Sequence, residues 1–253
     1  MKVSAIIQAR MASVRLPRKV LLDIMGKPVL EYVVERTRKA DSVEKVVVAT
    51  TLREEDAAIV ELAGRMDVLS YRGSEDDVLD RFYQSAKLFN IKHIARITAD
   101  CPLIDPELID SVIDHYFKSK ADYCSNALEE TFPDGEDIEI FSFKALEAAW
   151  REAKLLSERE HVTPFIKKHP EIFRIESYKS EKDLSGKRWT LDRKEDLEFI
   201  KKIIESLYAK NPYFGIKDIL RFLKENPAIE DINKGIERNE GYIRSLKEDR
   251  PIR

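Results

Sequence analysis

A chain of 253 residues, 43% of them hydrophobic, can bury one large core or two smaller ones, so a globular protein is expected. Its 44 basic and 47 acidic residues leave a net charge of −3, which excludes an overall field that would attract nucleic acid or a membrane surface. The two cysteines form no CxxC pair, and the apolar stretch at the start is too short for a signal peptide or a membrane span. We therefore expect a cytoplasmic protein with no nucleic-acid partner and no membrane insertion.

The first half of the chain alternates short, β-branched apolar segments with longer amphipathic ones. Such alternation favours an α/β fold with a mostly parallel, helix-covered sheet. The pattern predicts strands at Val3–Ile7, Lys45–Ala49, Asp67–Tyr71 and His93–Ile97, and helices at Val29–Lys39, Glu54–Arg65, Asp76–Phe89 and Pro106–Lys118.

The alternation is lost after Asp122–Ser125, and the second half is typical of α+β additions to the same sheet. No linker rich in Pro, Gly or Ser divides the chain, so residues 1–208 are predicted to form one domain. Residues 209–253 are predicted to be a C-terminal helical extension packed on that domain, with cover of a neighbouring subunit as the alternative. The expected strands are Ile138–Phe141, Phe173–Ser177 and Arg188–Leu191, and the expected helices are Phe143–Lys154, Glu158–Lys167, Lys194–Tyr208 and Ile216–Lys224.

A basic segment, Arg10–Lys19, follows the first predicted strand and carries four positive charges, no acid and no glycine. In an open α/β sheet, ligands bind in the crevice beyond the carboxyl ends of the strands, so these cations predict a phosphate-rich ligand. The alternative is a solvated basic loop. The glycines show neither GxG nor GxxxxG spacing, which argues against a dinucleotide oxidoreductase and a P-loop NTPase. Phosphates would have to be held by Arg and Lys side chains.

Two aspartates follow other predicted strands. Asp100 comes directly after His93–Ile97 and is placed to bind a magnesium ion that carries nucleotide phosphates, with a turn aspartate as the alternative. Asp192 follows Arg188–Leu191, but together with Glu195 it also has the spacing of a capping box. Asp105 precedes proline and glutamate and is predicted to cap a helix.

Together these segments resemble the cytidylyltransferases that activate acidic sugars, such as the 3-deoxy-manno-octulosonate and acylneuraminate enzymes, and most closely the spore coat polysaccharide biosynthesis branch. The resemblance implies a nucleotide-diphospho-sugar transferase type of fold, transfer of CMP from CTP to a sugar acid with release of pyrophosphate, and a homodimer. The motifs that carry it are QARMASVRLPRKVL, ITADCPLID and TLDRKEDLE, supported by DGEDIEIFSFKALEAAW and SEREHVTPFI.

The resemblance also implies roles for single residues. Arg10, Lys19 and Asp100 would be catalytic, and Asp100 and Asp192 would bind Mg²⁺. Two positions depart from the family pattern. Arg18 stands where relatives often have glycine, and would narrow the pocket or add a phosphate contact; Glu136 replaces an apolar residue. The implied nucleotide-binding residues are Gln8, Ala9, Arg10, Ser13, Arg15, Lys19 and Asp100.

The acceptor side is predicted from a strand pattern. Asp137 and Glu139 alternate with apolar residues, so both carboxylates face one side and could hydrogen-bond sugar hydroxyls, or else form a solvated strand face. His161 is a candidate for the acceptor or its carboxylate, with an exposed helical histidine as the alternative. Two other functions remain open at this point: a metal-dependent glycosyltransferase that uses a nucleotide-sugar donor, and a non-catalytic binding subunit of a glycan assembly system.

Overall fold

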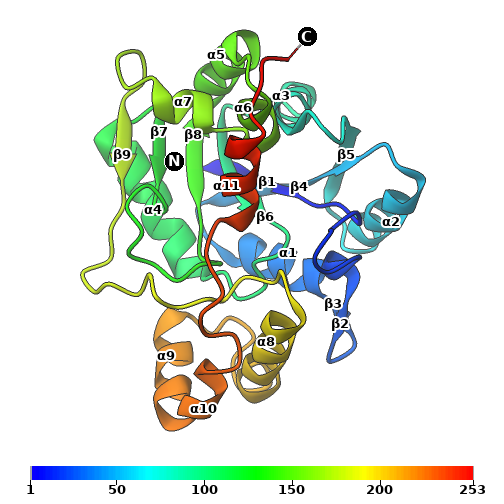
Figure 1. Cartoon of the computed structure of the whole chain (residues 1–253), viewed down its shortest axis with the longest axis vertical. Helices are drawn as coiled ribbons and strands as arrows, with labels where there is room; N and C mark the ends of the chain where they lie inside the picture. The colour runs from blue at the N-terminus through cyan, green and yellow to red at the C-terminus, as the bar shows by residue number, and fades with distance from the viewer. Residues whose placement is uncertain (1, 253) are drawn as a thin grey trace.

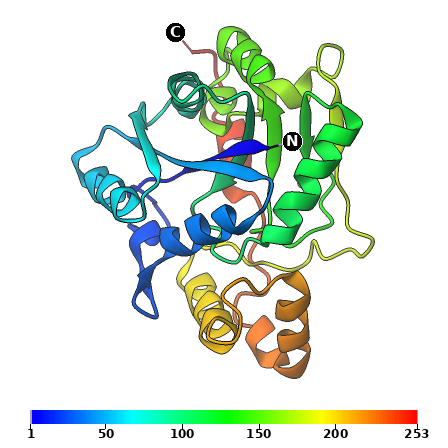
Figure 2. The same cartoon turned by 180° about the vertical axis from the view of Figure 1, so that it is seen from behind.

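A computed structural model describes residues 2–252 as a seven-stranded sheet with helices on both faces (Figures 1 and 2). The strands are β1 Val3–Gln8, β4 Val43–Thr51, β5 Leu69–Gly73, β6 His93–Thr98, β7 Tyr123–Ser125, β8 Glu139–Ser142 and β9 Ile175–Ser177. Their order is β5-β4-β1-β6-β8-β7-β9, and only β8 runs antiparallel to its neighbours. A separate hairpin joins β2 Asp23–Ile24 to β3 Lys27–Pro28. The mostly parallel sheet predicted from the sequence is confirmed.

The two faces of the sheet are covered by different helices. Side chains of β1 alternate between them: Ala5 and Ile7 pack in the core beneath α1, α2 and α4, and Ile6 packs in the core beneath α3, α5 and α7. This period of two is the pattern expected of a strand buried on both faces. The bounds of these helices are α1 Val29–Lys39, α2 Ala57–Arg65, α4 Pro106–Ser119, α3 Val78–Leu88, α5 Phe143–Glu152 and α7 Pro164–Lys168.

A third apolar cluster lies below the sheet in Figure 1 and is built on Trp189, Phe199, Phe214 and Ile219. It joins α8 Lys194–Leu207, α9 Ile216–Glu225 and α10 Pro227–Glu230 to the start of the chain. The chain then returns across the front of the sheet, where α11 Glu240–Lys247 contacts α6 Leu156–His161 (Figure 1). No helix between residues 2 and 252 combines the length and apolar character that a bilayer span requires.

Two predicted elements are wrong. Arg188–Leu191 is not a strand, because it runs beside two loops and makes only a single bridge, between Arg188 and Asp134. The helix expected at Glu158–Lys167 is two helices, α6 and α7. Val162 between them has a φ of 71° and a ψ of −55°, a γ-turn conformation that a β-branched residue rarely adopts, and the Thr163 N–H donates across it to the His161 carbonyl at 2.8 Å. Pro164 then starts α7.

Other differences are shifts or additions. The strand predicted at Asp67–Tyr71 begins at Leu69, because Asp67 has a φ of 53° and still belongs to the turn after α2. The predicted Glu54–Arg65 helix begins as a 3₁₀ turn, Glu54–Asp56, before α2. The polar stretch after α9 contains α10 and α11, which the sequence pattern did not predict.

Candidate active site

A cavity of about 540 Å³ opens beyond the carboxyl ends of β1 and β6. These strands are parallel neighbours, and the chain leaves them toward opposite edges of the sheet. This is the topological switch point, where ligands bind in open α/β sheets. Gln8, Ala9 and Arg10 reach the cavity from β1, and Asp100 reaches it from β6.

The basic segment after β1 folds along one wall of the cavity. Met11 and Leu16 are buried and anchor it, and the Met11 N–H donates to a carboxylate oxygen of buried Asp56 at 2.7 Å. The segment returns on itself, since the Arg18 N–H donates to the Met11 carbonyl at 3.0 Å. The predicted residues Arg10, Ser13, Arg15 and Lys19 all line the cavity as a result.

Lys19 joins the two predicted aspartates. Its Nζ lies 2.6 Å from Asp100 Oδ2 and 2.6 Å from Asp192 Oδ1, so the two carboxylates are close enough to share one cation. Burial opposes the charge of Asp100, but the Lys19 ammonium outweighs it and lowers the pKa of Asp100 to about 2. Burial likewise opposes the charge of Lys19, and the two carboxylates raise its pKa nonetheless. Arg15 adds a second cation, 2.7 Å from Asp192 Oδ2.

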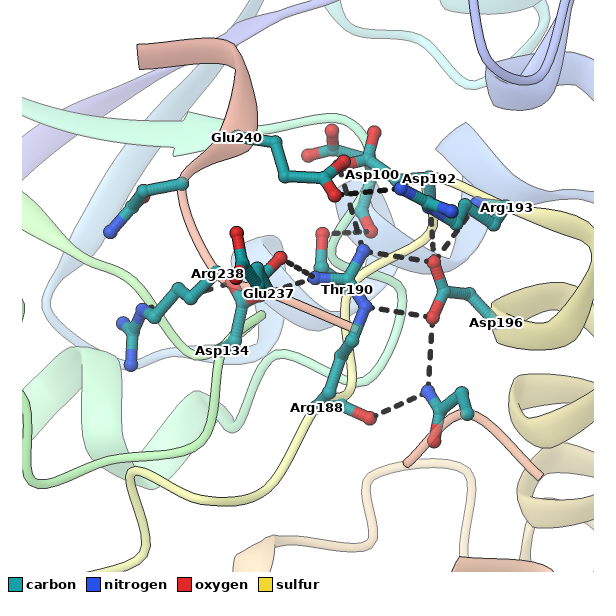
Figure 3. Close-up of polar contacts among 12 residues, drawn as sticks. Asp100, Asp134, Arg188, Thr190, Asp192, Arg193, Asp196, Glu237, Arg238 and Glu240 are labelled. Atoms are coloured by element: carbon teal, nitrogen blue, oxygen red, sulfur yellow. Dashed lines mark hydrogen bonds and ion pairs between the residues drawn. The ribbon is translucent and has the colours of Figure 1, made fainter. Parts of the chain in front are cut away.

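The backbone of Asp192 is held by Asp196 (Figure 3). Asp196 is fully buried, accepts the N–H groups of Asp192 and Arg193 at 2.9 Å each, and forms two hydrogen bonds with Arg188. The capping box predicted for Asp192 and Glu195 is therefore wrong, because Asp196 caps α8 and leaves the Asp192 side chain to face Lys19. The predicted cap at Asp105 is confirmed: its carboxylate accepts the N–H of Glu107 at 2.8 Å.

On the opposite side of the cavity, Asp137 and Glu139 both face inward, as their alternation predicted. Neither belongs to a solvated strand face. Glu139 pairs with Arg96 and accepts hydroxyl hydrogen bonds from Tyr123 and Thr163 at 2.6 and 2.5 Å. Burial opposes its charge, but Arg96 and then Lys167 lower the pKa of Glu139 to about 2.

Asp137 is held by a residue from the far end of the chain. Arg238 Nη2 lies 2.5 Å from Asp137 Oδ1. Burial raises the pKa of Asp137 to about 6. The negative charges of Glu139 and Glu130 act in the same direction, and Arg238 acts in the opposite one. The Asp137 side chain is 31% exposed and retains access to the cavity.

His161 also lines the cavity, but it is largely buried. Its Nε2 lies 2.9 Å from Ser245 Oγ, and its ring packs edge-on against Tyr242. Burial lowers the pKa of His161 to about 4, so the imidazole is neutral at neutral pH. The exposed helical histidine considered above is not what the structure shows.

Residues 4–226 match the family model described as Cytidylyltransferase. The chain belongs to the cytidylyltransferase family. It is 36% identical to a cytidylyltransferase of Leptospira borgpetersenii serovar Hardjo-bovis of known structure, over 94% of this chain and 100% of that one, with a TM-score of 0.87. It is 30% identical to the spore coat polysaccharide biosynthesis protein SpsF of Bacillus subtilis, over 88% of this chain and 94% of that protein.

A structure of CMP:2-keto-3-deoxy-manno-octonic acid synthetase complexed with CTP is 18% identical and covers 81% of this chain and 99% of its own, with a TM-score of 0.62. At that identity the likeness shows the fold alone. The family and the fold type that the sequence motifs predicted are confirmed.

The two departures from the family pattern both lie outside the cavity of this cytidylyltransferase. Arg18 is exposed and has a φ of 61°, a conformation that favours glycine, so it neither narrows the pocket nor lines it. Glu136 is fully buried behind the cavity, where it accepts the N–H of Asp105 at 2.8 Å.

Sequence reasoning missed several residues that line the cavity of this cytidylyltransferase. Asp134 was one, although it begins the DGEDIEIF motif. It pairs with Arg188 at 2.7 Å, while burial and the neighbouring Asp137 raise the pKa of Asp134 to about 7. Seven more have no local signal, since they come from α3, β6 and the C-terminal segment: Arg81, Arg96, Glu237, Asn239, Glu240, Tyr242 and Arg244.

Proposed function

We propose that this cytidylyltransferase is a Mg²⁺-dependent enzyme that transfers CMP from CTP to a sugar acid and releases pyrophosphate, in surface polysaccharide or glycan biosynthesis. The observation that carries the proposal is the convergence of Lys19 with Asp100 and Asp192 at the switch-point cavity. The likeness to SpsF supports the polysaccharide context, and the fold shared with the CTP complex supports the nucleotide.

The cations of the basic segment suit a triphosphate. Arg10, Arg15 and Lys19 line one wall, and Ser13 lies among them. Guanidinium and ammonium groups bind phosphate oxygens through charge-assisted hydrogen bonds, so no glycine-lined loop is required.

The donor set around Lys19 fits magnesium. Asp100 and Asp192 offer carboxylate oxygens in one place, and Mg²⁺ usually takes only one or two protein carboxylates because phosphate and water complete its shell. When bound there, the ion would replace Lys19 as the counter-charge of Asp100 and Asp192 and would neutralise phosphate charge, which would release the Lys19 ammonium for the pyrophosphate. No group of three or more His, Cys, Asp or Glu residues that could hold a metal occurs between residues 2 and 252, which suits an ion held largely by its nucleotide.

The proposed reaction is in-line attack of a sugar hydroxyl on the α-phosphorus. An oxygen–phosphorus bond forms to the sugar, the proton of the attacking hydroxyl passes to solvent water, and the bond from the α-phosphorus to the bridging oxygen of pyrophosphate breaks. Catalysis comes from positioning and charge stabilisation, with Arg10, Arg15 and Lys19 on the departing pyrophosphate. Because the oxygens of Glu139 are already engaged, Asp137 is the better candidate to hydrogen-bond sugar hydroxyls.

The test is pyrophosphate release with each nucleoside triphosphate, Mg²⁺ and a panel of sugar acids. Release that requires both CTP and one acid is the expected result, and Lys19→Gln should abolish it. Hydrolysis of a nucleotide-sugar donor would instead indicate a glycosyltransferase, and no turnover across the panel would indicate a binding subunit. We also propose a cytoplasmic homodimer, which light scattering coupled to size-exclusion chromatography and cell fractionation would test.

A further inference from the structure

The C-terminal strap, which we define as residues 231–247, runs from α10 across the front of the sheet to α11 and its contact with α6 (Figure 1). Its residues between Glu237 and Arg244 form part of the cavity lining. The strap lies beyond residue 226, where the match to the family model ends. It therefore adds a wall to the site from outside the segment that the family model matches.

One end of the strap contacts the acceptor side of the cavity. Arg238 donates to the Phe132 carbonyl at 3.1 Å and pairs with Asp137 at 2.5 Å, and its side chain is only 12% exposed. The neighbouring Asn239 donates to Glu130 at 3.0 Å. Figure 3 shows Arg238 beside Asp134, which also lines the cavity.

The next residue of the strap contacts the phosphate side. Glu240 pairs with Arg193 at 2.6 Å and approaches Arg15 Nε at 4.0 Å (Figure 3). The strap is then fixed to α6, because Ser245 Oγ donates to Glu160 at 2.7 Å and lies 2.9 Å from His161 Nε2. Its side chains thus reach both halves of the cavity from one short segment.

Asp137 depends on the strap for its orientation and charge. Burial, together with Glu139 and Glu130, favours the protonated carboxyl of Asp137. Arg238 is the stronger of the two cations that oppose this, and Arg96 is the other. The Arg238 guanidinium, at hydrogen-bond distance, also fixes the orientation of the Asp137 carboxylate, so that its remaining lone pairs are directed into the cavity.

We propose that the C-terminal strap selects the acceptor of this enzyme, with Arg238 as the positioning residue that holds Asp137 toward the acceptor hydroxyls. This inference rests on the proposed cytidylyl transfer. It adds a substrate-selecting role for a segment that the match to the family model does not include.

The test compares Arg238→Gln with Asp137→Asn, the double variant and Arg238→Lys in steady-state pyrophosphate release. Arg238→Gln and Asp137→Asn should each raise the KM for the acceptor about tenfold and leave the KM for CTP within about twofold. The double variant should be no worse than the more affected single variant, because both changes remove one pair. Arg238→Lys should recover part of the acceptor KM. Arg221→Gln, on the exposed face of α9, is the matched control and should change neither KM.

The outcomes separate the two proposals. No pyrophosphate release by the wild-type protein with any acceptor refutes the proposed function, and with it the role of the strap. Release by the wild type, with an unchanged acceptor KM in folded Arg238→Gln or with both KM values raised equally, refutes the strap alone. If Arg238→Gln does not fold, Asp137→Asn tests the other partner of the pair and Asn239→Ala tests a second contact of the strap, and an unchanged acceptor KM in both overturns the proposal.

Discussion

Replacing Glu139 by glutamine removes a buried charge and keeps the shape of the side chain. Glu139 is only 7% exposed and pairs with Arg96, which is itself 15% exposed. Glutamine retains an oxygen for the hydroxyl groups of Tyr123 and Thr163, but it leaves the guanidinium without its counter-charge. A carboxyl whose pKa falls from 4.5 to about 2 on folding contributes about 3 kcal/mol at neutral pH. That value agrees with the cost of breaking a buried ion pair, about 3–5 kcal/mol.

The sign of the pH dependence follows from the direction of the shift. Because the pKa of Glu139 is lower in the folded protein, its contribution is complete above pH 4.5 and is lost as the pH falls toward 2. We expect the free energy of unfolding to differ between wild type and Glu139→Gln by about 3 kcal/mol at pH 7 and by about 2 kcal/mol near pH 3.5.

Urea denaturation across this pH range measures the difference. Glu225→Gln, on an exposed position at the end of α9, is the control and should match the wild type throughout. A difference below about 1 kcal/mol at pH 7, or one that stays constant down to pH 3.5, would refute the ion-pair account of Glu139.

Three further substitutions separate chemistry from folding. Asp100→Asn should lower turnover at least about a hundredfold in a pyrophosphate assay, since it removes a carboxylate proposed to hold the Mg²⁺ that neutralises the phosphates; full activity would contradict its assignment. Asp105→Ala should lower the urea-derived free energy of unfolding by about 1–2 kcal/mol and leave kcat unchanged, because this carboxylate caps α4 and also accepts the first N–H of α9. Gly135→Ala should cost about 3 kcal/mol in the same measurement, because its φ of 107° and a Cβ only 2.6 Å from the Trp189 backbone both exclude a side chain; an unchanged stability would show that the loop relaxes.

The sheet and the basic wall of the cavity could be predicted because their signals are local. Strand β1 alternates between two cores, and the basic segment follows it directly, so the position of the cations is set by the end of one strand. Asp100 follows the neighbouring parallel strand, and the carboxyl ends of parallel strands meet at one edge. These two facts suffice to bring Lys19 and Asp100 together.

The wall that the C-terminal strap adds to the cavity could not be predicted in the same way. The strap is polar and highly charged, and its helix α11 is fixed by contacts of Ser245 with α6, more than 80 residues earlier. Nothing in the local pattern of residues 231–247 indicates that partner. The break at Val162 is similar, since the positive φ of this buried valine goes against its own preference and is imposed by the surrounding packing.

Sequence spacing alone does not show whether Asp192 or Asp196 caps α8. Asp192 and Asp196 both lie at the start of α8, and a helix N-terminus accepts a carboxylate from either. Burial decides between them. Asp196 is fully buried, and its oxygens are occupied by two backbone N–H groups and by Arg188, so it has none to offer a ligand. Asp192 therefore does not cap the helix, and its side chain forms ion pairs with Lys19 and Arg15. The orientation of Asp192 toward the cavity is thus set by Asp196, which binds the Asp192 backbone and is itself paired with Arg188.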